Sequence, residues 1–72
     1  MNGDTLRVLR AIADVTLREL GQESGVNYAT INEYEKGKGK LTTEQKLKIL
    51  EALERISKRK TLAHMTTVTQ EQ

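Results

Sequence analysis

The sequence predicts an all-α fold, because it contains clear helix-start signals and few residues that interrupt helices. Its 72 residues include no proline, and aromatic residues make up 3% of the chain, a composition that favours helices over a β-sandwich. Two segments, Thr16-x-x-Glu19 and Thr42-x-x-Gln45, have the pattern of a capping box, in which side chains accept hydrogen bonds from free amides at a helix start. A chain of this size is expected to form one small domain without a separate catalytic lobe.

The first half of the chain is expected to form two helices joined to a sharp turn. The first helix begins with Asp4 as its cap and ends near Asp14, and the second spans residues 17–24. Gly25 follows at a position that requires positive φ, and Val26 fills the corner with an apolar side chain. The apolar residues at helical spacing in the first helix are Leu6, Leu9, Ile12 and Ala13.

A third helix is expected at residues 28–36, with Asn27 as its N-cap and Gly37 at its end. Ile31 and Tyr34 face the interior, while the small Gly21 lets the second and third helices cross closely. The opposite face of the third helix is polar and free to match donors and acceptors on base edges in the major groove. This row consists of Asn27, Tyr28, Ala29, Asn32, Glu33 and Lys36.

The fourth helix is expected to start after the second capping box and to continue as far as Lys60, since no glycine or proline interrupts it. Residues 61–72 are rich in threonine and glutamine and are expected to form a flexible tail, so that the domain comprises residues 1–60. An edge strand, with Leu62, His64, Thr66 and Val68 alternating, is the alternative for the tail. The apolar residues of the fourth helix are Leu47, Ile49, Leu50, Leu53 and Ile56.

The charges are unevenly distributed, although the net charge is only +2. Residues 1–35 carry a net charge of −3 and residues 36–60 a net charge of +6. A basic half indicates a surface that faces a polyanion, and a solvated lysine-rich helix face is the alternative. The run Arg55, Lys58, Arg59, Lys60 is interpreted as a solvated helix end that complements the helix dipole, with a DNA-binding arm as the other reading.

Composition argues against several classes of function. The chain has no cysteine, and its lone histidine, His64, is not expected to hold a metal ion. The segment 37–40 lacks the serine or threonine that must follow the lysine of a phosphate-binding loop. No catalytic residue, cofactor or metal site is therefore expected. No apolar run approaches the roughly 18 residues of a membrane span, and a cysteine-free chain is expected to be cytoplasmic.

The motifs taken together resemble a known family. Thr-x-x-Glu-Leu, Gly-Val-Asn, Ile-Asn-x-x-Glu and x-Gly-Lys occur at fixed spacings within residues 16–38, with Leu9-Arg10 before them and residues 47–53 after them. The span from Leu6 to about Leu53 is similar to the lambda-repressor-like helix-turn-helix family of phage repressors and Cro proteins. The resemblance implies a compact bundle of four to five helices in which the second and third form the helix-turn-helix.

The resemblance also implies where DNA would bind. The helix 28–36 would be the recognition helix of a homodimer on a palindromic operator, with half-sites about one helical turn apart. Arg10 and Glu35 occupy the positions of an ion pair between the first and third helices. Base contacts are assigned to Asn27, Tyr28, Ala29, Asn32 and Glu33, and phosphate contacts to Thr16, Leu17, Lys36, Lys38 and Lys40. For these residues the alternative is a solvated face without a ligand, and for Tyr28 an aromatic ring packed over Leu17.

The sequence departs from the family pattern at two positions within the helix-turn-helix. Many members have glutamine at position 17, where it binds phosphate and braces the recognition helix, whereas Leu17 can do neither by hydrogen bonding; Tyr28 is the candidate replacement. Gly21 stands where alanine is usual, which keeps the close approach but lowers helix propensity by about 1 kcal/mol. The family usually has a separate fifth helix, but here ERISKRK directly follows Leu53.

The sequence therefore predicts a transcriptional regulator, specifically a repressor of phage or mobile-element type, that binds a double-stranded operator and is not an enzyme. One alternative is an antitoxin that uses the same fold on DNA and its tail on a toxin. Another is an interaction module that has lost DNA binding and contacts a protein through the fourth helix or the tail. The acidic Glu33 and the absence of glutamine at position 17 favour the second alternative.

Overall fold

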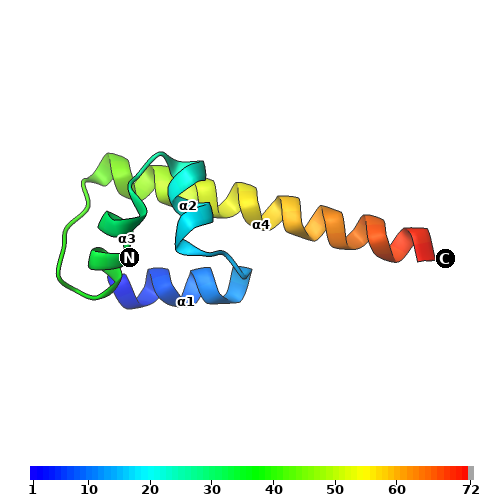
Figure 1. Cartoon of the computed structure of the whole chain (residues 1–72), viewed down its shortest axis with the longest axis horizontal. Helices are drawn as coiled ribbons and strands as arrows, with labels where there is room; N and C mark the ends of the chain where they lie inside the picture. The colour runs from blue at the N-terminus through cyan, green and yellow to red at the C-terminus, as the bar shows by residue number, and fades with distance from the viewer. Residues whose placement is uncertain (72) are drawn as a thin grey trace.

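Four helices follow one another along the chain in the computed structural model, which describes the backbone of residues 1–71 and the side chains of residues 1–63. The predicted all-α fold is confirmed, and the described residues form no strand. In Figure 1, α2 and α3 lie between α1 and the first half of α4. The helices are α1 (Gly3–Ala13), α2 (Leu17–Ser24), α3 (Tyr28–Glu35) and α4 (Thr43–Glu71).

The start of α1 differs from the prediction. Asn2, not Asp4, is the N-cap, and its Oδ1 accepts a hydrogen bond from the Thr5 amide at 2.8 Å. Asp4 lies inside the first turn, where its carboxylate pairs with Arg7 at 3.0 Å. Asparagine and aspartate both cap helices well, so the sequence alone does not distinguish Asn2 from Asp4 as the N-cap. The helix ends at Asp14 as expected, in a left-handed conformation with φ of 56°.

Each helix contributes one large, completely enclosed side chain to the core, namely Leu6, Leu20, Ile31 and Ile49. Not every apolar residue at helical spacing joins this core, because Ile12 keeps 77% of its surface exposed. Leu9, Leu47 and Leu50 are exposed as well. The other core residues are Val15, Val26, Tyr34, Leu41, Ala52, Leu53 and Ile56.

Helix α4 begins as predicted and ends later than predicted. Thr42 Oγ1 accepts from the Gln45 amide at 3.0 Å, and Gln45 Oε1 accepts from the Thr42 amide at 2.9 Å, which forms the second capping box. The helix then continues to Glu71, so the expected end near Lys60 is wrong. Once a helix has formed, each added residue gains a hydrogen bond, and no glycine or proline stops this one.

The segment after Lys60 is helical, so the alternative of an edge strand is wrong. Figure 1 shows the C-terminal part of α4 projecting beyond the other three helices. Among the side chains of this helix that the structure describes, Ile56 is the last one in the core. The side chains of His64, Thr66 and Val68 lie outside the described residues, and the flexibility expected of 61–72 stays a prediction. None of the helices in the described part of the chain is both long and apolar enough to cross a membrane.

Candidate nucleic-acid interface

The capping box at Thr16 sets the start of α2. The Thr16 hydroxyl accepts from the Glu19 amide at 3.0 Å, and the Glu19 carboxylate accepts from the Thr16 amide at 3.0 Å. The hydrogen bond from the Thr16 amide, followed by one from Lys60, lowers the pKa of Glu19. Thr16 remains exposed, and its hydroxyl hydrogen is still free to be donated because the oxygen only accepts here.

The turn between α2 and α3 is built as the sequence predicts. Gly25 has φ of 75°, and its amide donates to the Gly21 carbonyl at 3.0 Å. Val26 is 5% exposed and belongs to the core, so it holds the corner in place. At Gly21, a Cβ atom would lie 3.1 Å from Tyr28 Cβ and 3.1 Å from the Val26 carbonyl oxygen. The two helices therefore approach so closely here that a side chain larger than that of glycine would be tightly packed.

Helix α3 divides into a buried face and an outward face. Ile31, Tyr34 and Glu35 are buried. Tyr34 is further fixed by its hydroxyl, which donates to the Met1 carbonyl at 2.8 Å. Because these residues determine how the helix is rotated, the predicted polar row is left on the other side. Asn27, Tyr28, Ala29, Glu33 and Lys36 are exposed, and Asn32 is half-buried.

The start of α3 presents Asn27 and Tyr28 side by side on this outward face. Asn27 Oδ1 accepts from the Ala29 amide at 2.8 Å, so the capping role predicted for Asn27 is confirmed. Its NH₂ group is not used by this cap and retains two donors. The Tyr28 side chain is 54% exposed and lies outside the core.

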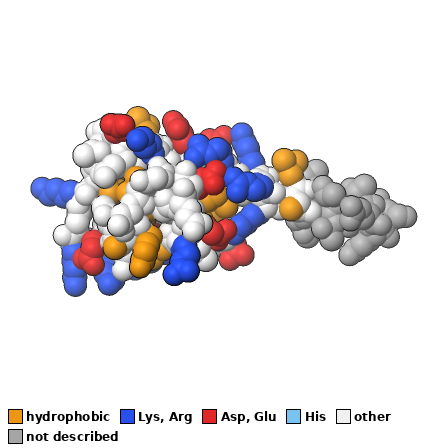
Figure 2. Space-filling view, turned by 45° about the horizontal axis from the view of Figure 1, so that its top comes forward, with side chains coloured by type: hydrophobic (Ala, Val, Ile, Leu, Met, Phe, Trp, Pro, Cys, Tyr) orange, Lys and Arg blue, Asp and Glu red, His pale blue; other side chains and the backbone are white. Residues whose placement is uncertain are grey.

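Three of the residues predicted to contact phosphate are lysines at the end of α3 and in the loop that follows it. Lys38 and Lys40 are exposed on the loop between α3 and α4, and the loop is tied to α3 by hydrogen bonds from the Lys38 and Gly39 amides to the Glu33 carbonyl, at 2.9 and 3.2 Å. Lys36 is exposed at the end of α3. Figure 2 shows basic side chains gathered at the end of the body that carries this loop and again along α4.

Leu17 differs from the other phosphate candidates. It is half-buried and packs against the core, so only its backbone amide can donate a hydrogen bond. The side chain that many family members use at this position is thus replaced by an apolar anchor for α2.

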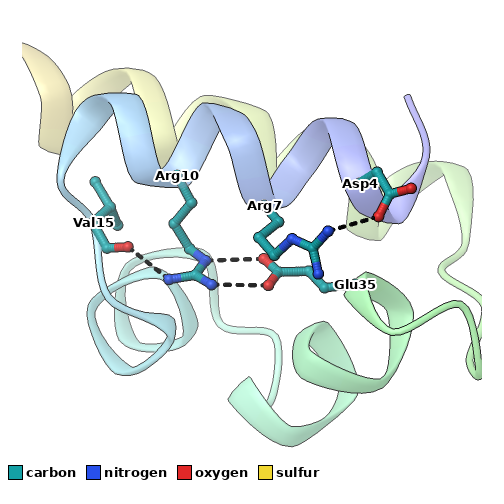
Figure 3. Close-up of polar contacts among 5 residues, drawn as sticks. All are labelled: Asp4, Arg7, Arg10, Val15 and Glu35. Atoms are coloured by element: carbon teal, nitrogen blue, oxygen red, sulfur yellow. Dashed lines mark hydrogen bonds and ion pairs between the residues drawn. The ribbon is translucent and has the colours of Figure 1, made fainter.

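An ion pair holds α3 from its inner side (Figure 3). Arg10 donates from Nε to Glu35 Oε2 at 2.9 Å and from Nη2 to Glu35 Oε1 at 2.8 Å. A third bond from Arg10 Nη1 reaches the Val15 carbonyl at 3.0 Å, at the connection between α1 and α2. The hydrogen bond to Glu35 raises the pKa of Arg10. The contact predicted from the resemblance is present, and Arg10 links α1 to α3 and to the connection between α1 and α2.

The basic run of α4 has a role that the sequence did not reveal. Arg55 and Arg59 both contact Glu23 of α2, at 3.1 and 2.8 Å. Lys60 contacts Glu19 at 3.2 Å and donates to the Asp14 carbonyl. The interpretation of this run as a helix end is therefore wrong, because α4 continues to Glu71, and these three basic residues, although partly exposed, pair with α2. Lys58 pairs at 2.8 Å with Glu54 of its own helix.

A surface groove runs between α2 and the start of α3. Its lining includes Asn27 and Tyr28, which the sequence marked as DNA contacts, and also Arg18 and Gln22, which it did not. The signal available in the sequence was their spacing of four residues on α2, which places both on one side of the helix beside Gly21. No group of three or more histidine, cysteine, aspartate or glutamate residues that could hold a metal occurs among the described residues.

The close helix pair, the buried inner face of α3 and its polar outward row define a helix-turn-helix protein that binds DNA. Comparison with protein families agrees, since the family described as helix-turn-helix matches residues 6–59. The chain belongs to this family, in its Cro/C1-type, lambda-repressor-like form, and it is a DNA-binding regulator. Neither a curated protein nor a solved structure matches the chain.

Proposed function

We propose that this regulator recognises one specific double-stranded operator and represses transcription by occupying it. The observation that carries the proposal is the orientation of α3. Its inner residues Ile31, Tyr34 and Glu35 are buried against the rest of the domain, so that its polar row faces outward as a continuous surface. A helix held in this way fits the width of the major groove of B-DNA.

The outward row offers two kinds of contact to base edges. The amide of Asn32 matches the donor and acceptor of adenine, and the carboxylate of Glu33 can accept from the amino group of cytosine. Tyr28 and Ala29 at the start of α3 would meet the neighbouring base pairs, the alanine through its methyl group. Glu33 repels phosphate, so it contributes to sequence discrimination more than to affinity.

Phosphate contacts on both sides of α3 would set the register of the protein on the duplex. Lys36, Lys38 and Lys40 supply them at the end of α3 and in the loop that follows. Thr16 supplies one at the start of α2, through the hydroxyl hydrogen that the capping box leaves free. These contacts carry no sequence information but provide most of the salt-dependent affinity.

The proposed protein is cytoplasmic and binds a palindromic operator as a homodimer, in which two copies of α3 enter successive major grooves on one side of the duplex. Bound there, the dimer would exclude polymerase from an overlapping promoter. The net charge of +6 on residues 36–60 favours the approach of this segment to DNA.

Selection from a pool of duplexes with a randomised central segment tests the proposal. The full chain is expected to enrich one two-fold symmetric motif and to bind it more tightly than a scrambled duplex of the same composition, in 150 mM salt. Equal affinity for the selected and scrambled duplexes would remove the claim of a specific regulator. Sedimentation of the complex reports whether two copies bind each motif.

A second candidate is an antitoxin that binds DNA through the same unit and a toxin through α4. It is favoured by the course of α4, which continues to Glu71, whereas none of the side chains described between residues 57 and 63 belongs to the core. Co-expression with the product of the adjacent gene distinguishes the two candidates. A stable complex that is lost when residues 61–72 are removed, while DNA binding persists, would support the antitoxin.

A further inference from the structure

Arg18 stands on the outward side of α2, beside the start of the recognition helix. It is exposed, and it lines the groove between α2 and α3 together with Gln22, Asn27 and Tyr28. Gly21 forms part of the same lining, where the two helices are closest. A cationic side chain therefore shares one concave surface with two residues predicted to contact DNA.

Arg18 also differs from the other four arginines of the chain. Arg7 pairs with Asp4, Arg10 with Glu35, and both Arg55 and Arg59 with Glu23. No hydrogen bond or ion pair to a described residue engages the guanidinium of Arg18. The nearest acid in sequence, Glu19, is occupied by the Thr16 amide and by Lys60. Nothing within the described domain thus competes for the charge of Arg18.

The residue before Arg18 is Leu17, whose side chain cannot bind phosphate. Leu17 is half-buried against the core and cannot donate a side-chain hydrogen bond. The groove that borders the recognition helix is therefore lined by the free guanidinium of Arg18, whereas the preceding residue, Leu17, packs against the core instead. The guanidinium has a planar set of donors that suits two oxygens of one phosphate, in contrast to the single point charge of a lysine.

We infer that Arg18 binds a backbone phosphate of the operator at the α2–α3 groove, and that it does so in place of a side chain at position 17. The inference rests on the proposed function, since it assigns a further contact to the same DNA site. Gln22, four residues later on the same side of α2, and the Tyr28 hydroxyl lie at the same groove and offer additional donors to this phosphate.

The test measures binding of the full chain to its selected duplex by fluorescence anisotropy at several salt concentrations. Arg18→Gln is expected to weaken binding by about tenfold or more, as the loss of one charge-assisted contact does. It should also reduce the slope of log K against log salt by about 0.9, the value for one phosphate. Arg18→Lys should keep the slope and recover only part of the affinity. The matched control is Arg7→Gln, on exposed α1, which should leave both quantities unchanged.

Ethylation interference supplies a second readout that does not depend on absolute affinity. Of the phosphates in each half-site whose ethylation interferes with wild-type binding, one should no longer interfere with binding of Arg18→Gln. If Arg18→Gln retains the wild-type affinity, salt slope and interference pattern, the inference is wrong while the proposed function stands. If the wild type itself selects no motif, the proposed function fails first and the inference fails with it. Circular dichroism of the variant, expected to match the wild type because Arg18 is exposed, separates lost contact from lost fold.

Discussion

Arg10 and Glu35 form a two-point contact between α1 and the inner face of α3, with donor–acceptor distances of 2.9 and 2.8 Å. The Glu35 side chain is only 4% exposed, and Arg10 is the cation that pairs with it. Because Glu35 ends the helix whose other face is proposed to read DNA, the ion pair fixes the rotation of the reading face. Stability and recognition thus both depend on this part-buried pair.

Removing one partner of this pair should be costly. Glu35→Gln is expected to lower the free energy of unfolding by about 2–3 kcal/mol, because a partly buried guanidinium loses its counter-charge. Urea denaturation at pH 7 measures the change. Glu44→Gln, which breaks an exposed pair with Lys48, should cost less than about 0.5 kcal/mol. Replacing both partners, as in Arg10→Met with Glu35→Leu, should recover most of the loss. A Glu35→Gln effect as small as that of Glu44→Gln would contradict this account of the pair.

Acid should loosen the attachment of α4 to α2. The hydrogen bonds from Arg55 and Arg59 lower the pKa of Glu23 below its ordinary value of 4.5, and those from Thr16 and Lys60 do the same for Glu19. Because the pKa values are lower in the folded state, protonation of Glu19 and Glu23 favours unfolding. Their contacts therefore contribute fully to the free energy of unfolding above about pH 4.5, and this contribution is lost as the pH falls through the folded-state pKa values.

The Glu23→Gln variant isolates one of these two groups. Its free energy of unfolding should lie below that of the wild type at pH 7, and the two should converge as the pH falls through the lowered folded-state pKa of Glu23, below which the wild-type carboxylate is also neutral. Urea denaturation across this range checks the prediction. A difference in the free energy of unfolding that stays constant with pH would show that the charge of Glu23 does not stabilise the fold.

The contact at Gly21 predicts a graded response to side-chain size. Gly21→Ala should change the free energy of unfolding by less than about 1 kcal/mol, since the gain in helix propensity offsets a tight contact with Tyr28. Gly21→Val should lower it by about 1–3 kcal/mol, because the larger side chain must push α3 away. Thermal unfolding of both variants measures the difference. Equal stability of the two would mean that the helices are not held at the distance seen here.

The parts of the fold that the sequence predicts are those set by local chemistry. Both capping boxes, the left-handed Gly25 and the Asn27 cap depend on residues within one turn of each other. The end of α4 was missed because residues 61–72 contain neither a proline nor a glycine, and a weak helix former does not stop a helix that has already formed.

The contacts that the sequence could not predict join residues that are far apart in the chain. Glu23 lies 32 residues before Arg55 and 36 before Arg59, so that no spacing rule connects them. The role of Arg18 is not predicted either, because the groove that it lines forms only when α2 and α3 pack together. The predicted reading residues, in contrast, all belong to one short helix or its N-cap, and the buried side of this helix is marked by Ile31 and Tyr34.

Base readers and phosphate binders should respond differently to substitution. Asn32→Ala combined with Glu33→Ala should change which duplexes are selected, since these two groups are proposed to contact base edges. Lys38→Ala should weaken binding to every duplex alike and reduce the salt slope by about one. Selection with each variant, followed by salt titration on the wild-type motif, separates the effects. Identical outcomes for both variants would refute the division of roles.

The central claim is that the outward row of α3 meets the base edges of a duplex. Amide chemical-shift mapping of the isotope-labelled full chain with its selected duplex tests it most directly. The account predicts that the largest shifts fall on residues 27–33, with smaller ones at Thr16, Arg18 and Lys38 and none along the outer side of α1. A saturated complex in which the amides of 27–33 do not move, while another surface does, would contradict it.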